Sequence, residues 1–187
     1  KNSNKNSYQQ LPSRTQKQYY SGDIPWIKSG EMNDGYIGNS EEKITSEAVE
    51  KSSAKLFEVG TLLVAMYGAT AGKTAILSRD ATTNQAECGI FKNENVNLEF
   101  VRHTLILQRD FLLDQRHGGA QPNLSQTSIR NLLIPLPDVG EQNKIAESLI
   151  ATSKKIETMQ EKLFTYQNLF KTLLHDLMSG ERRIINI

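Results

Sequence analysis

Short apolar runs alternate with turn residues over the first half of the chain. The runs occupy residues 24–27, 62–67, 74–77 and 88–91. Runs of this length, separated by glycine and small polar residues, are typical of strands in a mixed or antiparallel sheet. Between the first two runs, "SEEKITSEAVEKSSAKLF" has two candidate caps, Ser40 and Thr45, and enough helix-forming residues for a short helix. Residues 1–22 are polar and predict a loose lead-in with "LPSRTQKQYY" as its only candidate anchor.

A helical pattern begins at Asn97. In "NLEFVRHTLILQRDFLLDQR" apolar side chains recur at helical spacing, which predicts a buried helix. Its apolar face consists of Phe100, Val101, Leu105, Leu107, Phe111 and Leu112. The loop "HGGAQPN" follows, Ser125 can cap a short turn in "SQTSIRNL", and "LLIPLP" predicts a strand stopped by proline.

The pattern changes after Pro137, where a long helix is predicted. Asp138 and Glu141 have capping-box spacing, and Gly180 is a natural stop. The roughly 41 residues between these signals would form a helix about 61 Å long. Apolar residues recur at alternating intervals of four and three, with Thr152 in the one missing place. The apolar positions are Ile145, Leu149, Ile156, Met159, Leu163, Tyr166, Phe170, Leu173 and Leu177.

This heptad seam predicts a coiled coil. A straight helix drifts away from a repeat of 3.5 residues, so a seam held over more than four heptads needs a partner helix. A long helix packed on its own domain would tolerate a 3.6-residue period and is the weaker alternative. We therefore predict an α+β fold, with a mixed or antiparallel sheet in residues 1–137 and a coiled-coil helix with a short tail in residues 138–187.

The stretch "GATAGKT", residues 68–74, suggests a phosphate-binding loop, but its spacing is short. Such a loop needs four residues between its first glycine and the Gly-Lys-Thr, so that several amides can point at phosphate oxygens. Gly68 and Gly72 enclose only three residues. The following "TAILSRD" predicts a strand where the motif requires a helix. A glycine-rich turn between two strands is the better interpretation, and nucleotide hydrolysis is a rival that rests on this stretch alone.

Charge and composition exclude few partners. Lysine and arginine total 22 against 21 acids, so the net charge of +1 neither demands nor excludes a polyanion. The single cysteine, Cys88, cannot form an intrachain disulfide, and three histidines add too little for a zinc cluster. A reducing cytoplasm fits this usage. No stretch approaches the roughly 18 apolar residues of a membrane span, so we expect no membrane partner.

The candidate chemistry is binding and not catalysis. His103, His117 and Cys88 lack the partners of a catalytic set, and Glu141 lacks the neighbours of a nuclease metal site. Side chains of the kinds that bond phosphates and base edges lie instead in or beside predicted turns. They are Lys28, Asn33, Tyr36, Tyr67, Thr70, Lys73, Asn84, Gln85, Arg116, His117, Gln121 and Asn123. Without further information, the composition predicts no more than a soluble mixed domain with a long dimerising helix.

The ordered segments from Gly22 to Ile184 resemble a known family. "GDIPWIKSGEM", "GTLLVAMYGATAGKTAIL", "NQAECGIF", "GGAQPNLS" and "IPLPDVGEQNKIAESL", before a helix closing with "LLHDLMSGERRI", are similar to the DNA-specificity subunits of type I restriction-modification systems. The resemblance implies a target-recognition domain, residues 1–137, that reads one half of a split site in double-stranded DNA. A full subunit of that family carries two such units with antiparallel helices, and this chain contains one.

The resemblance also implies partners. A methyltransferase subunit would bind S-adenosylmethionine and methylate adenine, and a restriction and translocation subunit would join through the complex. The specificity subunit itself catalyses nothing and needs no cofactor or metal. The chain is then either a half-sized subunit that pairs with itself or the second half of a longer one. A homodimer with antiparallel helices would hold two recognition domains about 60 Å apart and read a palindromic, bipartite target.

Within that frame the candidate DNA-binding residues divide by role. Lys28, Lys73 and Arg116 are predicted to contact phosphates. Tyr36, Tyr67, Thr70, Gln85, Gln121 and Asn123 are predicted to contact base edges or to shape the loops that carry the readers. An alternative leaves specificity to the loops at residues 31–45 and 92–97. Because the charge is near neutral, we expect weak DNA binding without the methyltransferase.

One rival explains the heptads equally well. A coiled-coil adaptor, whose globular domain binds protein and not DNA, would carry the same seam. The side chains of Thr152, Tyr166 and Phe170 do not decide between parallel and antiparallel pairing. The antiparallel direction is implied by the resemblance.

Overall fold

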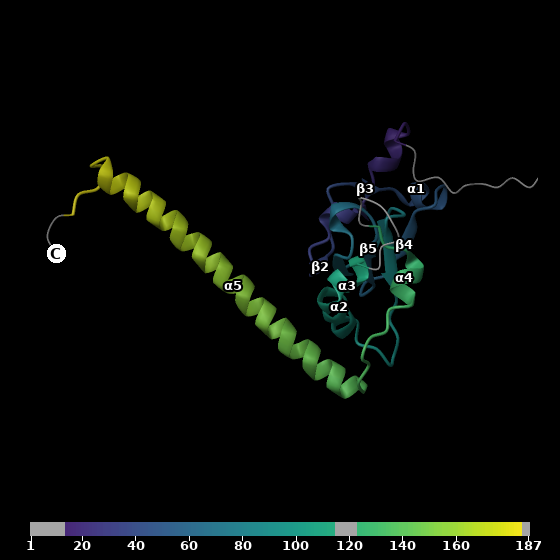
Figure 1. The fold of residues 1–187 in the computed structure, drawn as a ribbon. Coiled ribbons are helices and arrows are strands. Elements are labelled where there is room, and N and C mark those ends of the chain that lie inside the picture. Colours follow the sequence, from purple (N-terminus) through teal and green to yellow (C-terminus); the bar gives the residue numbers. More distant parts are fainter. Residues whose placement is uncertain (1–13, 115–122, 185–187) are drawn as a thin grey trace, which may run out of the picture. The chain divides into compact units, whose positions relative to one another are not determined.

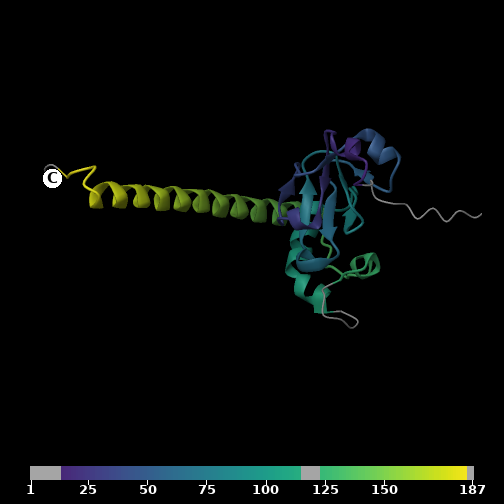
Figure 2. The same ribbon diagram turned by 90° about the horizontal axis from the view of Figure 1, so that it is seen from above.

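The computed structural model describes residues 14–114 and 123–184. The chain divides into two compact units, Lys1–Asn143 and Lys144–Ile187. The first unit holds all the strands and short helices of the described residues, whereas the second holds most of one long helix (Figures 1 and 2).

Eight short strands form two sheets in the first unit. They are β1 (Ile24–Ile27), β2 (Tyr36–Ile37), β3 (Lys43–Ile44), β4 (Lys55–Phe57), β5 (Leu62–Ala65), β6 (Thr74–Leu77), β7 (Ala81–Thr83) and β8 (Glu87–Ile90). One sheet has the order β3-β1-β7-β4 and the other β2-β6-β5-β8. The β1–β7 and β2–β6 pairs are parallel and the others antiparallel. The predicted α+β fold with mixed sheets is confirmed.

The main apolar core joins the two sheets. Ile27, Phe57 and Ala81 from one sheet cluster with residues of the other sheet, among them Leu63 and Leu77. The burial of these side chains stabilises the fold by roughly 1.5–3 kcal/mol for each large residue. This core requires the short strands β4 and β7, which periodicity did not predict because each spans only three residues.

A second cluster ties down the start of the described chain. Tyr19, in the 3-10 helix η1 (Lys17–Tyr20), is buried with Trp26 and Ile44. The Tyr20 ring stacks on Trp26 at a centroid distance of 5.4 Å, and the amide of Thr45 donates to the carbonyl of Tyr19 at 2.9 Å. The predicted anchor in "LPSRTQKQYY" is therefore confirmed for the residues that the structure describes.

Two short helices have the caps that the sequence indicates. Helix α1 (Ser46–Glu50) is capped by Thr45, whose side chain accepts from the amide of Ala48. Helix α4 (Gln126–Arg130) is capped by Ser125, whose side chain accepts from the amide of Ser128. Ser40, the other candidate, is not a cap, because its hydroxyl donates to the carbonyl of Trp26 at 2.7 Å.

The strand predicted in "LLIPLP" is wrong. Residues 132–138 form no strand, and Leu133 is 90% exposed. Pro135 and Pro137 have no amide hydrogen, so this segment cannot complete a ladder of hydrogen bonds. It is an extended connection that leads into the long helix.

The helix predicted from Asn97 is present but broken. Helix α2 (Leu98–Leu107) begins at Asn97, whose side chain accepts from two amides, and α3 (Arg109–Asp114) follows after Gln108. The predicted burial of Leu107 and Phe111 is wrong, since they are 84% and 58% exposed. The break at Gln108 changes the phase of the apolar stripe, so these two side chains leave the core.

Helix α5 (Val139–Met178) has 40 residues and is continuous. The Asp138 side chain accepts from the amide of Glu141 at 3.0 Å, and Gly180 beyond the helix has a φ of 77°. The predicted helix, with its start and stop, is confirmed. Seam residues such as Met159, Leu163 and Phe170 are more than half exposed in the single chain. No helix among residues 14–114 and 123–184 is long and apolar enough to cross a membrane.

Candidate nucleic-acid interface

The "GATAGKT" segment forms a compact turn between β5 and β6. The 3-10 helix η3 (Gly68–Thr70) occupies its first part, and the amide of Gly72 returns to the carbonyl of Ala65 at 2.8 Å. Gly68 and Gly72 have φ angles of 77° and 80°, a region that favours glycine. Strand β6 follows at once, so the segment lacks the helix that would hold a phosphate. The predicted glycine-rich turn between two strands is confirmed.

Backbone hydrogen bonds bind two further loops to this turn. The amide of Met66 donates to the carbonyl of Ala86 at 2.7 Å, and the amide of Leu124 donates to the carbonyl of Met66 at 2.6 Å. Tyr67 and Asn123 form an isolated β-bridge. A third loop, the 3-10 helix η2 (Ser29–Glu31), contacts η3. We call these four segments, residues 28–31, 66–73, 84–86 and 123–124, the loop cluster.

The loop cluster brings together most of the residues that were predicted to contact DNA. Tyr67, Gln85 and Asn123 are exposed, whereas Lys28, Thr70 and Lys73 are half-buried. These six are contributed by segments up to 95 residues apart in the chain, from Lys28 to Asn123. Arg116 and Gln121 lie outside the described residues.

Tyr36 lies in a different setting. It is in β2 and lines a hollow with Glu99 of α2. Burial and, to a smaller extent, the neighbouring Glu99 carboxylate raise the pKa of the Tyr36 phenol to about 12. The phenol therefore remains a hydrogen-bond donor at neutral pH, but it is not part of the loop cluster.

Lys28 has an anionic neighbour of its own. Its ammonium lies 2.7 Å from a carboxylate oxygen of Glu42, which also pairs with Arg14 at 3.1 Å. The hydrogen bond with Glu42 raises the pKa of Lys28, and the same bond lowers the pKa of Glu42. A phosphate at Lys28 would have to compete with this carboxylate. Lys73 is therefore the lysine of the loop cluster that is more available to a phosphate.

The shape of the turn depends on Arg109 of α3. The Arg109 guanidinium binds the carboxylate of Asp34 and donates from Nε to the carbonyl of Gly72 at 3.0 Å. Asp34 has a φ of 60°, and its carboxylate also accepts from the amide of Thr74 at 3.0 Å. A second arginine, Arg102, donates to the carbonyl of Asp34. Sequence reasoning missed these residues, because partners 68 and 75 positions apart share no local pattern.

Glu87 is a second residue that the sequence did not single out. It is 5% exposed, and neither carboxylate oxygen has a hydrogen-bond partner within the described part of the chain. Burial, with a smaller effect of the negative Glu31, raises the pKa of Glu87 to about 7, although nearby Ser29 opposes the shift. Glu87 lines a hollow of about 410 Å³ beside Gln85 and Arg130. Glu87, next to residues 84–86 of the loop cluster, therefore keeps its proton in part of the molecules near pH 7.

The loop cluster offers hydrogen-bond donors and acceptors on loops that backbone hydrogen bonds join to one another. Its amides and phenol match base edges and backbone oxygens, and Lys73 matches a phosphate. Among residues 14–114 and 123–184, no three His, Cys, Asp or Glu side chains are grouped to hold a metal ion.

Comparison with known proteins identifies the family of the chain. Residues 9–164 match a family described as the type I restriction modification DNA specificity domain. The chain is 32% identical over 163 residues to the type I restriction enzyme MjaIX specificity subunit of Methanocaldococcus jannaschii, covering 81% of the chain and 38% of that subunit. It is 27% identical over 144 residues to the EcoR124I/EcoR124II specificity subunit of Escherichia coli, covering 74% of the chain and 36% of that subunit.

Solved structures agree in fold. A chain from a study of complex assembly and conformational transition of the type I R-M system has a TM-score of 0.68 and 14% identity, over 88% of this chain and 40% of that one. The type I restriction-modification S subunit from M. genitalium has a TM-score of 0.60 and 16% identity, over 93% and 43%. The chain spans less than half the length of each of these relatives.

Proposed function

We propose, since this chain belongs to the family of type I restriction-modification DNA specificity domains, that its globular unit recognises one half of a bipartite site in double-stranded DNA. The family match over residues 9–164 is the observation that carries the proposal. Membership in a family of specificity domains implies a non-catalytic role. The assignment of recognition to residues 1–137 and of spacing to residues 138–187 is part of the proposal.

The loop cluster supports a division between positioning and reading. Lys73, with Lys28 and Arg116, would hold phosphates and fix the domain on the duplex. The exposed amides of Gln85 and Asn123, with Gln121, would face base edges, where amide side chains pair with adenine. Tyr67 and Thr70, held between them, would shape the loop or contact a base edge, and Tyr36 would act from β2. The short hydrogen bonds around Met66 support a preformed surface.

The exposed seam of α5 supports a homodimer. In an antiparallel pair of heptad helices, each a position meets a d position of the other helix. In one register, each of the ten seam residues lies opposite a seam residue of the other helix. The numbers of the two residues in a layer add up to the same total in every layer. The layers join Ile145 with Leu177, Leu149 with Leu173, Thr152 with Phe170, Ile156 with Tyr166, and Met159 with Leu163.

This register also matches side-chain sizes. The smallest seam residue, Thr152, meets the large Phe170, whereas parallel pairing would place Phe170 against Phe170. A core packs best when large and small side chains alternate across it. Two-fold pairing of α5, about 60 Å long, would place the two N-terminal ends of the helices, and the recognition units attached to them, at opposite ends of a rod. Identical half-sites would then be inverted.

The partners follow from the same proposal. The dimer would dock methyltransferase subunits that carry S-adenosylmethionine, and a restriction and translocation subunit would join the complex. With a net charge of +1, the chain would release few counterions from DNA and bind weakly by itself. We place this complex in the cytoplasm.

Selection from random duplexes tests DNA reading directly. The purified chain, mixed with its methyltransferase subunit, is incubated with a library of random duplexes, and bound DNA is sequenced. Enrichment of a short half-site is the expected result. A matched sample with Lys73→Ala should bind less DNA but enrich the same sequence. Binding without any enriched sequence, or no binding, would favour a protein-binding adaptor over a DNA reader.

A further inference from the structure

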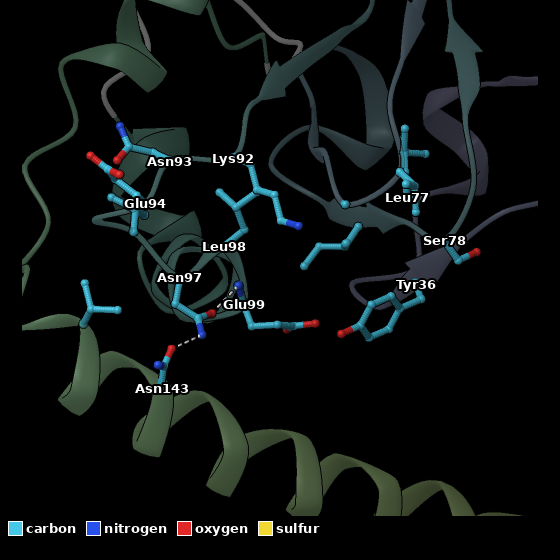
Figure 3. A pocket seen from close by; sticks show the side chains of 15 residues that line it. Tyr36, Leu77, Ser78, Lys92, Asn93, Glu94, Asn97, Leu98, Glu99 and Asn143 are labelled. Carbon is cyan, nitrogen blue, oxygen red and sulfur yellow. Dashed lines mark hydrogen bonds between the residues drawn. The ribbon is translucent and has the colours of Figure 1, made fainter.

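A hollow of about 710 Å³ lies in the globular unit beside the first turn of α5 (Figure 3). It is separate from the loop cluster and shares none of its residues. Its apolar wall comes from the connection between β4 and β5, from strand β6 and from the residues at the start of α2. The residues of this wall are Val59, Ile76, Leu77, Val96 and Leu98. We call this space the α5-base groove.

The α5-base groove also holds charged side chains, one of which has an unpaired oxygen. Glu94 and Lys92 are exposed lining residues, and Glu99 is half-buried. One carboxylate oxygen of Glu99 binds Arg102 at 2.8 Å, but the other is buried and has no hydrogen-bond partner within the described residues. Figure 3 shows this carboxylate pointing toward the Tyr36 phenol. A buried carboxylate oxygen without a donor is unfavourable, so the groove is suited to a cationic group on an apolar stem.

The position of the groove along α5 is fixed by hydrogen bonds. The amide of Asn97 donates to the Gln142 side chain at 2.9 Å, and the Asn97 side chain donates to Asn143 at 2.7 Å. The Gln142 side chain donates to the carbonyl of Pro137 at 2.8 Å. Val139 and Asn143 both line the groove. Residues 139–143 of the helix are therefore level with it.

The antiparallel register assigns an occupant to this level. The last layer of the seam joins Ile145 to Leu177 of a second copy. If the same register continues past this layer, residues 139–143 lie beside residues 179–183 of the second copy. There α5 has ended, and Gly180 has turned the chain out of the helix. The segment that follows contains Arg182, Arg183 and Ile184, all exposed in the single chain.

We propose that residues 179–184 of a second copy dock in the α5-base groove. Ile184 packs on the apolar wall, and a guanidinium of Arg182 or Arg183 donates to the free oxygen of Glu99, with Glu94 adding attraction at the edge. This inference rests on the proposed antiparallel pairing. The chain's own residues 179–184 cannot serve, because the whole of α5, about 60 Å of helix, separates them from Val139.

Docking of this kind would lock the register of the dimer. A heptad seam permits slips of seven residues, since each slip matches apolar positions again. A slip would carry the two arginines past Glu99 and leave its oxygen unpaired at both ends. The two-fold axis doubles the effect, because each dimer contains the contact twice.

Site-specific photocrosslinking of the full chain tests the contact. Ile184 is replaced by p-benzoylphenylalanine, and chains with light and heavy isotopes are mixed so that crosslinks between copies are recognised by mass. The expected result is crosslinks between copies to peptides that contain residues 59–60, 76–78 or 92–99. The same photoreactive group at Glu157, on the outer side of the helix, is the matched control and should give none of them.

A charge variant gives a second readout. Arg182→Gln with Arg183→Gln should weaken the dimer about tenfold or more, because the charged hydrogen bond to Glu99 is lost at both ends of the dimer. Lys171→Gln should leave the dimer unchanged. The docking would be overturned if the crosslinks of the dimer map elsewhere, or if its dissociation constant does not change when both arginines are replaced. Either result would leave the antiparallel pairing intact. A chain that stays monomeric would overturn both.

Discussion

Arg109 binds the carboxylate of Asp34, 75 residues earlier in the chain, and donates at the same time to the carbonyl of Gly72. The guanidinium thereby joins α3, the segment before β2 and the glycine-rich turn. The turn that carries Thr70 and Lys73 thus owes its shape to a residue on another element.

Loss of this arginine should destabilise the domain. Arg109→Met removes the charged partner of the partly buried Asp34 carboxylate, which keeps its bonds from Thr74, and removes a donor from the Gly72 carbonyl. We expect a loss of about 1–3 kcal/mol in the free energy of unfolding, measured by urea denaturation. Arg109→Lys keeps the charge but not the planar fork, so it should lose less. Equal stability of the Met variant and the wild type would contradict the positioning role.

Two glycines of the turn provide a matched pair. Both have positive φ, but a Cβ on Gly72 would lie 2.9 Å from Cγ of Arg109, whereas a Cβ on Gly68 would meet nothing within 4 Å. Gly68→Ala should cost about 1–2 kcal/mol from backbone strain. Gly72→Ala should cost more, because it also displaces Arg109. Thermal or urea unfolding compares the two, and a costlier Gly68→Ala would be inconsistent with the described contacts.

Glu87 predicts a dependence of stability on pH. Its folded-state pKa is raised to about 7 from the ordinary 4.5, so the folded state holds a proton that the unfolded state has released between these values. Its contribution is therefore fully present below about pH 4.5 and is lost as the pH rises toward 7. The loss amounts to about 3 kcal/mol at most.

The Glu87→Gln variant isolates this effect. Urea unfolding of both proteins at pH 5 and pH 8 should show the variant gaining stability relative to the wild type at pH 8. The difference between the two proteins should be smaller at pH 5, where the wild-type side chain is still neutral in the folded state. A difference that does not change with pH would mean that Glu87 titrates normally.

The direction of helix pairing can be read from disulfides. In a Cys88→Ser background, chains with Met159→Cys are mixed with chains carrying Leu163→Cys. Antiparallel pairing places residue 159 opposite residue 163, so the disulfide should join one chain of each kind. Parallel pairing would place residue 159 opposite residue 159, and disulfides between identical chains would dominate. Non-reducing electrophoresis with chains of two sizes distinguishes these results.

The loop cluster predicts two kinds of DNA-binding defect. Lys73→Ala should weaken binding to all sequences and reduce the salt slope by about one, as expected for one phosphate contact. Gln85→Ala and Asn123→Ala should each cost about 1–3 kcal/mol on the preferred site and less on others. Titrations over a range of salt concentrations, with the methyltransferase subunit present, measure both. If neither amide variant alters affinity or preference, the loop that carries it is scaffold.

Local patterns predicted some elements well and others poorly, for identifiable reasons. Helix α5, 40 residues long, was predictable because its seam repeats from Ile145 to Leu177 and its ends are flanked by Asp138 and Gly180. The strands β1, β5, β6 and β8 each have four residues and stand out from their flanks. Strands β2 and β3 have two residues each, too few for a period, and depend on partners elsewhere in the chain.

The site shows the same division. Residue types near turns indicated Tyr67, Thr70, Lys73, Gln85 and Asn123, and the structure gathers them. The residues that hold them in place, Arg102 and Arg109, were missed, because a side chain that bonds a carbonyl 68 positions away leaves no local trace. Glu87 was also missed, since a strand residue that is polar and buried looks in sequence like a polar residue on an exposed face.

A map of methylated adenines tests the central claim most directly. The chain is co-expressed with its methyltransferase subunit in cells that lack other adenine methylation, and modified positions are located across the genome. Two identical half-sites in inverted orientation, with one constant spacing, are the predicted result. Two unrelated half-sites, or modification at a single undivided motif, would contradict an account in which two copies of this chain pair along α5 and each reads half of the target.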